Sequence, residues 1–153
     1  MLNRASASDF DLVMSIFRHH KDYFPHIRHD KIWQYINSGN VILEDDVVIT
    51  YRKYQKRTQL GECYAEKGHV IINQIASLRE GEGKGKKVLK QFLKEFDSTV
   101  WLTVRFDNYH AINFYFMNSF YAVGHIAWKD DTIDGVVMNS MPNRATLDLF
   151  MID

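Results

Sequence analysis

The chain has 153 residues, of which 46% are hydrophobic and 14% aromatic, and its 19 basic side chains balance 19 acidic ones. This composition is typical of a folded globular domain and excludes a disordered chain, while the zero net charge gives no global attraction to nucleic acid or to an anionic membrane surface. Because Cys63 is the single cysteine and no apolar run approaches the ~20 residues of a membrane span, we expect one cytoplasmic domain over residues 1–153, without disulfides or a membrane partner.

The first third of the chain predicts helices and strands in succession. The expected elements are a short strand at 1–5, a helix starting at Ser8 or Asp9, a helix at 30–37, and strands at 41–43 and 47–54. Pro25 interrupts the first helix and Gly39 ends the second. Asp45 and Asp46 form the turn between the strands. Residues 52–68 are polar and irregular, and they either extend this hairpin or form a mobile loop.

The centre of the chain carries the pattern on which the functional prediction depends. Residues 69–78 form an apolar, β-branched run that suits a strand buried on both faces, and residues 88–96 place apolar side chains at helical spacing. Gly81, Gly83 and Gly85 lie between them. Glycines at such a junction let the backbone bend sharply and approach a ligand closely, and the free N–H groups of the helix's first turn favour an anion. The sequence therefore predicts a phosphate cradle.

The second half continues the alternation. Residues 99–106 alternate between apolar and polar side chains and predict a strand. Asn108 can cap a helix that runs to about residue 118. Residues 120–128 and 133–138 flank a turn-rich segment and predict an antiparallel hairpin, and residues 146–152 are apolar enough for a last strand or a subunit contact.

Two of these segments resemble the motifs of one family. Residues 80–89, Glu-Gly-Glu-Gly-Lys-Gly-Lys-Lys-Val-Leu, look like the pyrophosphate-binding motif Q/R-x-x-G-x-G/A of the GNAT superfamily of acyl-CoA N-acyltransferases. Residues 108–120, Asn-Tyr-His-Ala-Ile-Asn-Phe-Tyr-Phe-Met-Asn-Ser-Phe, are similar to the family's second signature, N-x-x-A-x-x-F-Y-x-x-x-G-F. Glu80 stands where the family usually has Gln or Arg, and Ser119 replaces a glycine. The order of elements fits the family over essentially the whole chain.

The resemblance implies a fold and a reaction. The fold is α/β (α+β), a single GNAT-like domain with a central mixed, mostly antiparallel sheet of about six to seven strands and helices on both faces. The reaction moves an acetyl group from acetyl-CoA to a primary amine by direct attack, with Tyr115 as the general acid for the departing thiolate. The cofactor-binding residues that it implies are Ile75, Ala76, Ser77, Gly81, Glu82, Gly83, Lys84, Gly85, Lys86 and Asn108, the last of which can equally cap its helix.

The general base and the acceptor stay open at this point. The candidate bases near the expected cleft are Glu44, Glu62, Glu66 and His69. Asn73 and Gln74 are adjacent amides in an apolar strand, so they point to opposite faces, and we expect one to line the acceptor site and the other to bond within the core. We expect the acceptor to be a small-molecule amine or a protein lysine or N-terminus, with a modified nucleobase as a further alternative. A homodimer is compatible with the apolar C-terminal segment.

Other functions fit fewer residues. A CoA-binding sensor or scaffold would keep the fold without the chemistry. A nucleic-acid-directed enzyme would use the basic patch of Lys53, Lys56 and Arg57, but the zero net charge argues against a nucleic-acid partner. The histidines in the first 30 residues, at 19, 20, 26 and 29, match no zinc spacing, and we expect no metal.

Overall fold

The structure is a computed structural model that describes residues 1–140. Its elements are η1 (Ala7–Asp9), α1 (Phe10–His19), α2 (His29–Asn37), β1 (Val41–Glu44), β2 (Val47–Lys53), β3 (Thr58–Leu60), β4 (Cys63–Ala65), β5 (Val70–Ser77), α3 (Lys84–Glu95), β6 (Val100–Arg105), α4 (Tyr109–Met117), β7 (Tyr121–Trp128) and β8 (Ile133–Asn139). Six strands form one mixed sheet in the order β1-β2-β5-β6-β8-β7, and β3 pairs with β4 in a second, two-stranded sheet. The predicted α/β fold is confirmed. None of the helices in residues 1–140 is long and apolar enough to cross a membrane.

The chain divides into two compact units, and each unit is built from two separate stretches of sequence. The first unit consists of Met1–Arg52 and Ile72–Glu95, and the second, within the described residues, of Lys53–Ile71 and 96–140. Strand β5 therefore gives its first two residues to the second unit and the rest to the first. A single domain over residues 1–153 stays a prediction.

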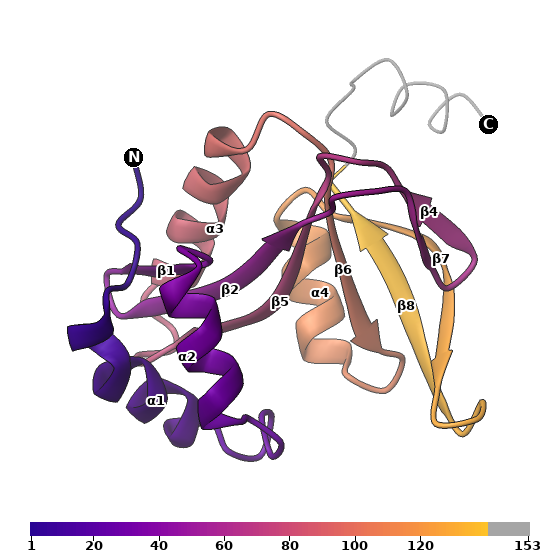
Figure 1. Ribbon diagram of the computed structural model, residues 1–153. Coiled ribbons are helices and arrows are strands. Elements are labelled where there is room, and N and C mark those ends of the chain that lie inside the picture. The colour runs from indigo at the N-terminus through magenta and orange to yellow at the C-terminus, as the bar shows by residue number, and fades with distance from the viewer. Residues whose placement is uncertain (141–153) are drawn as a thin grey trace. The chain divides into compact units, whose positions relative to one another are not determined.

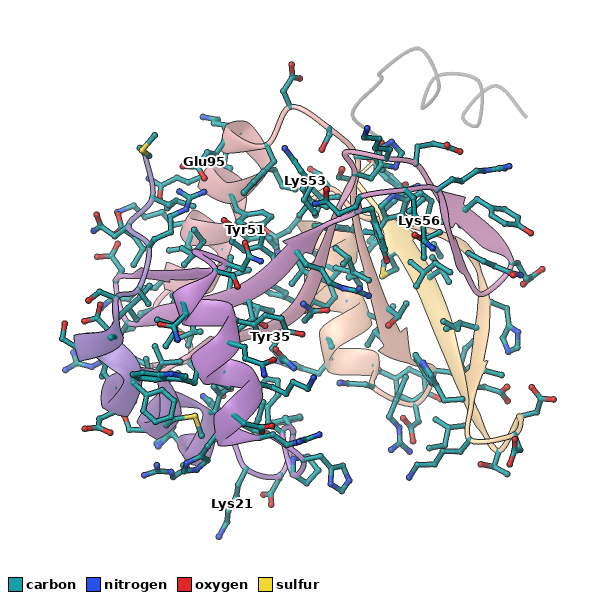
Figure 2. The ribbon with its side chains drawn as sticks, in the orientation of Figure 1. Lys21, Tyr35, Tyr51, Lys53, Lys56 and Glu95 are labelled. Carbon is teal, nitrogen blue, oxygen red and sulfur yellow. The ribbon has the colours of Figure 1, made fainter. Side chains whose placement is uncertain are left out.

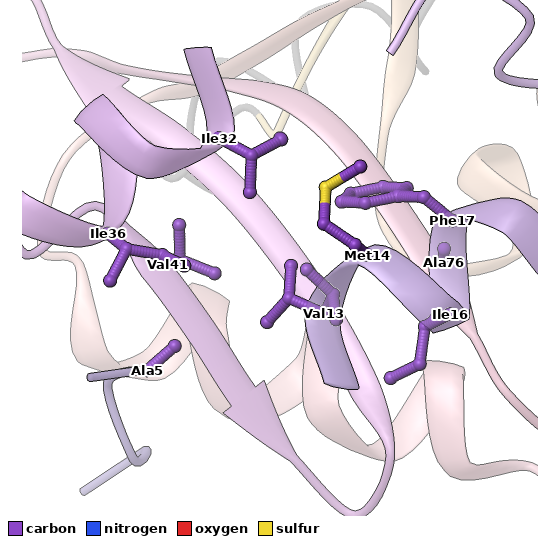
Figure 3. Packing of buried hydrophobic residues seen from close by; sticks show 10 residues of the cluster. Ala5, Val13, Met14, Ile16, Phe17, Ile32, Ile36, Val41 and Ala76 are labelled. Atoms are coloured by element: carbon purple, nitrogen blue, oxygen red, sulfur yellow. The ribbon is translucent and has the colours of Figure 1, made fainter. Parts of the chain in front are cut away.

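The core of the first unit lies between two helices and one face of the strands β1, β2 and β5. Helices α1 and α2 lie side by side (Figure 1) and bury the apolar side chains that recur along them at helical spacing. Figure 3 shows these side chains meeting those of the strands. The cluster contains Ala5, Val13, Met14, Ile16, Phe17, Ile32, Ile36, Val41, Val48 and Ala76. Each large side chain buried in this way contributes about 1.5–3 kcal/mol relative to exposure.

Helix α3 covers the opposite face of the same strands. Val48 belongs to the cluster under α1 and α2, and Tyr51 lies three residues further along β2, so its side chain points to the other face. There the ring of Tyr51 contacts Phe92 of α3 edge to face, with ring centroids 5.3 Å apart. Both faces of this part of the sheet are therefore covered by helices, as expected from the sequence.

The second unit is mainly antiparallel. Strand β8 pairs with both β6 and β7, and a register shift interrupts the pairing with β7 between Ala122 and Gly124. Gly124 at this irregularity has no room for a side chain, because an added Cβ would lie 2.6 Å from the sulfur of Cys63 on β4. The core of this unit contains Tyr54, Ala65, Ile71, Trp101 and Val137.

One segment differs from its predicted structure. The strand expected at residues 1–5 is reduced to an isolated bridge between Arg4 and Ile42. Residues 52–68, for which an extended hairpin and a loop were both open, include the separate β3–β4 hairpin, in which Leu60 pairs with Cys63 around a left-handed Gly61 at φ +59°. The strand or subunit contact predicted at 146–152 lies outside the described residues.

A half-buried ion pair joins the N-terminal segment to the end of α3. The guanidinium of Arg4 donates to both carboxylate oxygens of Glu95, at 3.0 and 2.6 Å, and to the hydroxyl of Tyr51 at 3.2 Å. Tyr51 and Glu95 are labelled in Figure 2. The pKa of Glu95 is lowered, chiefly by the hydrogen bonds from Arg4. Glu95 is the last residue of α3, where the helix dipole disfavours a carboxylate, so Arg4 offsets an otherwise unfavourable charge.

We predict that Arg4→Met lowers the free energy of unfolding by about 1–2 kcal/mol at pH 7, because it leaves the Glu95 carboxylate half-buried without this partner. A carboxyl group whose pKa is lower in the folded state stabilises the fold above its unfolded pKa and loses that contribution as the pH falls. The difference in the free energy of unfolding between the wild type and Arg4→Met should therefore become smaller from pH 5 to pH 3. Urea unfolding at several pH values measures it, with Arg105→Met of the exposed Arg105–Asp107 pair as the control. A gap that did not change with pH would contradict this role for Glu95.

Helix α4 ends at a residue in the left-handed conformation. Ser119 has φ +72°, and the N–H of the next residue, Phe120, donates to the carbonyl of Tyr115 at 3.0 Å. Glycine is favoured at such a position because it lacks the Cβ that strains other residues there. Ser119 stands where the signature that residues 108–120 resemble has a glycine, the residue that this geometry favours.

We predict that Ser119→Gly raises the free energy of unfolding by about 1 kcal/mol, because it removes this strain. Ser38→Gly is the matched control, since Ser38 also follows a helix but has φ −88°. The control should be neutral or destabilising, as glycine there only increases the freedom of the unfolded chain. Thermal unfolding of both variants measures the difference, and equal shifts would contradict the explanation.

Candidate functional site

The turn between β5 and α3 is the centre of the candidate site. Residues 78–83 connect Ser77, the last residue of β5, to Lys84, the first of α3. Gly81 and Gly83 have φ +81° and +73°, so both adopt the left-handed conformation that glycine allows. An added Cβ at either position would meet no atom within 4 Å. The turn is therefore open on the side where these two glycines lack a side chain.

Backbone amides at the start of α3 have no partner within the described part of the chain. The first helical hydrogen bond runs from the N–H of Lys87 to the carbonyl of Gly83, at 3.1 Å. The N–H groups of Lys84, Gly85 and Lys86 donate to no acceptor in residues 1–140. Free amides at the positive end of a helix dipole attract an anion. Together with the open glycines they suit a phosphate group.

Side chains of the turn pair with one another or with α1. Glu82 and Lys84 form an ion pair at 3.5 Å. The Oγ of Ser77 donates to the carbonyl of Arg79 at 3.0 Å, and the carbonyl of Ser77 is 2.6 Å from Nε2 of His20. The carboxylate of Glu80 lies 3.6 Å from Nδ1 of the same histidine. His20, the C-cap residue of α1, thus contacts the last residue of β5 and also Glu80, three residues later.

The two adjacent amides of β5 have different surroundings. Gln74 hydrogen-bonds to the buried Thr50 of β2, both through its side-chain oxygen and through its backbone N–H, the latter at 3.1 Å. The Nδ2 of Asn73 is buried and has no hydrogen-bond partner among residues 1–140. Gln74 is therefore the amide that bonds within the core, and a role for Asn73 in lining an acceptor site stays a prediction.

Helix α4 positions Tyr115 in the second unit. The side chain of Asn108 accepts a hydrogen bond from the N–H of Ala111 at 3.2 Å, so Asn108 caps this helix. The ring of Tyr115 packs against Phe114 and Phe120, with centroid distances of 5.5 and 5.7 Å. Burial raises the pKa of Tyr115, which keeps its hydroxyl protonated near neutral pH.

The carboxylates proposed as general bases are all engaged in contacts. Glu44 accepts from the amide of Asn3 at 2.7 Å, Glu62 from the N–H of His125 at 2.7 Å, and Glu66 pairs with Arg57 at 3.0 Å. These contacts explain the three side chains without a catalytic role, and none of the three stands out as a base.

His69, the fourth candidate base, is locked in one tautomer. Its Nδ1 accepts hydrogen bonds from the indole N–H of Trp101 at 2.9 Å and from the N–H of Glu66 at 3.1 Å. Two donors at one nitrogen require a lone pair there, so a neutral ring carries its proton on Nε2. Burial lowers the pKa of His69, which favours that neutral form. In this tautomer neither nitrogen is free to accept a proton from an amine.

The remaining polar groups offer little chemistry. Within residues 1–140 no three side chains of His, Cys, Asp or Glu gather where they could hold a metal. Burial raises the pKa of Cys63, which makes it a poor nucleophile. Arg57 of the basic patch lies over the ring of Tyr64, 4.4 Å from its centroid, besides its pairing with Glu66, so this cation already has protein partners.

Sequence reasoning missed two residues of this site. His20 contacts Ser77, which lies 57 residues later, and no local pattern signals that contact. Thr50 is a polar residue in an apolar strand, and this oddity could have indicated a bonding partner such as Gln74.

Comparison with known proteins gives matches at the level of structure. No protein-family model matches the chain, and no curated protein matches it in sequence. Arabidopsis thaliana NAA60 in complex with acetyl-CoA has a TM-score of 0.69 at 16% identity, over 91% of this chain and 97% of its own. The ribosomal-protein-S18-alanine N-acetyltransferase of Escherichia coli has a TM-score of 0.63 at 14% identity, over 91% of each chain. A GNAT-family acetyltransferase of Bacillus cereus has a TM-score of 0.65 at 17% identity, over 91% of this chain and 94% of its own.

At this low identity the likeness shows the fold. It covers nine-tenths of the chain in each comparison and includes the six-stranded mixed sheet. The chain has the fold of the GNAT-family acetyltransferases.

Proposed function

We propose that the chain is an acetyl-CoA-dependent N-acetyltransferase that transfers an acetyl group to a primary amine. The observation that carries this proposal is the turn at Gly81 and Gly83, which is open on its glycine side and followed by amides without partners in residues 1–140. One of the similar structures holds acetyl-CoA, and its fold is shared by this chain over 91% of the length.

The glycine turn would hold the diphosphate of acetyl-CoA. The N–H groups from residue 81 to residue 86 would donate to phosphate oxygens, and Lys84 and Lys86 would add positive charge. Glu82 pairs with Lys84, so its carboxylate is partly neutralised and need not repel the phosphates. The donor groups and the space at the turn fit the chemistry of a diphosphate.

The end of β5 would accompany the pantetheine arm. We assign this contact to the backbone of Ile75, Ala76 and Ser77. Because the carbonyl of Ser77 already accepts from His20, the contacts would come mainly from Ile75 and Ala76. An extended arm can pair with a strand through backbone hydrogen bonds in the same way as another strand.

In the proposed reaction, the lone pair of a neutral amine attacks the thioester carbonyl carbon, and a backbone N–H stabilises the charge that grows on the oxygen. The carbon–sulfur bond breaks, the sulfur takes its electron pair and accepts the proton of the Tyr115 hydroxyl, and the amine nitrogen loses its proton to a carboxylate or to water. The contacts of His69 leave water as the simplest acceptor for that last proton.

Tyr115 is partly buried, and this has two effects on the proposed role. Its raised pKa ensures that the hydroxyl carries a proton near neutral pH, but it also makes the phenol a weaker acid. Desolvation by bound substrates would raise the proton affinity of the departing thiolate as well, which would restore part of the driving force.

A protein N-terminus is the acceptor that we propose to test first. One of the structures with this fold is the ribosomal-protein-S18-alanine N-acetyltransferase of Escherichia coli, whose acceptor is a protein. Since fold likeness alone carries this choice, a panel should also include small-molecule amines.

We predict that Gly83→Ala raises the Kd for CoA at least tenfold, because its methyl group enters the space proposed for the phosphates. Gly39→Ala is the matched control: Gly39 also has φ +73°, an added Cβ also meets nothing within 4 Å, and it lies in the same unit. Both substitutions introduce similar strain of about 1 kcal/mol. Isothermal titration calorimetry with CoA and thermal unfolding separate binding from stability.

Two results would contradict the cradle. One is a wild-type protein that does not bind CoA, and the other is a Gly83→Ala variant that binds CoA as tightly as Gly39→Ala does.

We predict that Tyr115→Phe lowers kcat about 100-fold and leaves the Kd for CoA unchanged, because the ring still packs while the proton donor is lost. Tyr109→Phe is the control, since Tyr109 lies on the same helix with 72% of its surface exposed. Thiol release from acetyl-CoA over a panel of peptides and amines measures the rate. Full activity in Tyr115→Phe would exclude it as the acid, and tight CoA binding without turnover of any amine would favour a CoA sensor.

A further inference from the structure

His20 holds the glycine turn at two points. Its side chain is only 11% exposed, and Nε2 lies 2.6 Å from the carbonyl oxygen of Ser77. Its Nδ1 faces the carboxylate of Glu80 at 3.6 Å. Ser77 ends β5 and Glu80 immediately precedes Gly81, so one side chain of α1's C-terminal cap spans the beginning of the turn.

The partners of His20 define what the ring does. A carbonyl oxygen only accepts hydrogen bonds, so Nε2 carries a proton and donates it to Ser77. A lone pair on Nδ1 would face the carboxylate of Glu80, whereas a proton there would attract it. The short bond to Ser77 is the stronger contact, because Glu80 is 68% exposed and the solvent screens its charge.

The same contact bears on an unusual feature of the turn. Glu80 places a carboxylate at a position where the resembling motif has Gln or Arg, next to the amides that would bind phosphate. A carboxylate so close to a diphosphate repels it unless a cation or a hydrogen-bond donor accompanies it. Within the first unit, His20 is the side chain that faces Glu80.

We infer that His20 is a positioning residue for the diphosphate of CoA: it anchors the end of β5 through Ser77 and holds the Glu80 carboxylate beside its own ring. The inference rests on the proposed function. His20 touches neither CoA nor the reacting atoms and acts through the shape and charge of the turn. Its removal should therefore weaken CoA binding more than it weakens the fold.

The first experiment compares three histidine variants by isothermal titration calorimetry with CoA. His20→Phe keeps a planar ring but loses the Nε2–H donor and the second ring nitrogen, and we expect about a tenfold higher Kd. His20→Gln keeps a donor that can reach the Ser77 carbonyl, and it should lose no more than about threefold. His26→Gln, at an exposed histidine of the same unit, should bind CoA as the wild type does.

The second experiment tests the charge. Glu80→Gln removes the carboxylate, so in the His20→Phe background it should recover about half of the lost affinity on a logarithmic scale. A purely structural role for His20 would lower thermal stability without such a rescue, because the double variant would be as weak in CoA binding as His20→Phe. Hydrogen exchange of the amides of residues 78–86, measured without CoA, should rise in His20→Phe and stay near the wild-type rate in His20→Gln.

The outcomes separate the two proposals. A wild-type protein that does not bind CoA would overturn the proposed function and this inference with it. Two results would overturn the role of His20 alone. One is that the wild type binds CoA and His20→Phe binds it with the same Kd. The other is that amide hydrogen exchange in residues 78–86 is the same in His20→Phe as in the wild type.

Discussion

The chain must leave β5 and enter α3 within residues 78–83, and this constraint shapes the candidate site. Two left-handed glycines make the reversal possible, and their missing side chains leave one side of the turn open. The same reversal begins α3 with amides that no carbonyl of residues 1–140 satisfies. Backbone conformation alone therefore gathers several hydrogen-bond donors beside an open space. The side chain of His20 contacts the carbonyl of Ser77, just before this turn.

The surrounding core keeps this turn in place without contributing chemistry. Helices α1 and α2 press on one face of β1, β2 and β5, and α3 covers the other face through contacts such as Tyr51 with Phe92. The polar pair of Thr50 and Gln74 adds a hydrogen-bonded link between β2 and β5 inside this apolar layer. Such a link favours one register, because a shifted strand would leave both groups buried without a partner.

Local signals explain what could be predicted from the sequence. Glycine positions, the Asp45–Asp46 turn and the Asn108 cap depend on a few neighbouring residues, and the structure has all three. Contacts between distant residues escaped prediction: His20 with Ser77, Trp101 with His69, and Thr50 with Gln74 depend on how the elements pack. The role proposed for Tyr115 came from a family pattern, since nothing in the local sequence distinguishes a catalytic phenol from a structural one.

The division of the chain into two interleaved units has a consequence for its synthesis on the ribosome. The core under α1 and α2 includes Ala76, so residues 1–52 cannot complete their packing when they emerge. Their packing can be completed only after β5 and α3 have left the exit tunnel. Residues 53–71 emerge in between, and they belong to the second unit, whose remaining residues are synthesised later. During this interval the apolar faces of two nascent helices are uncovered, and they are natural targets for chaperones.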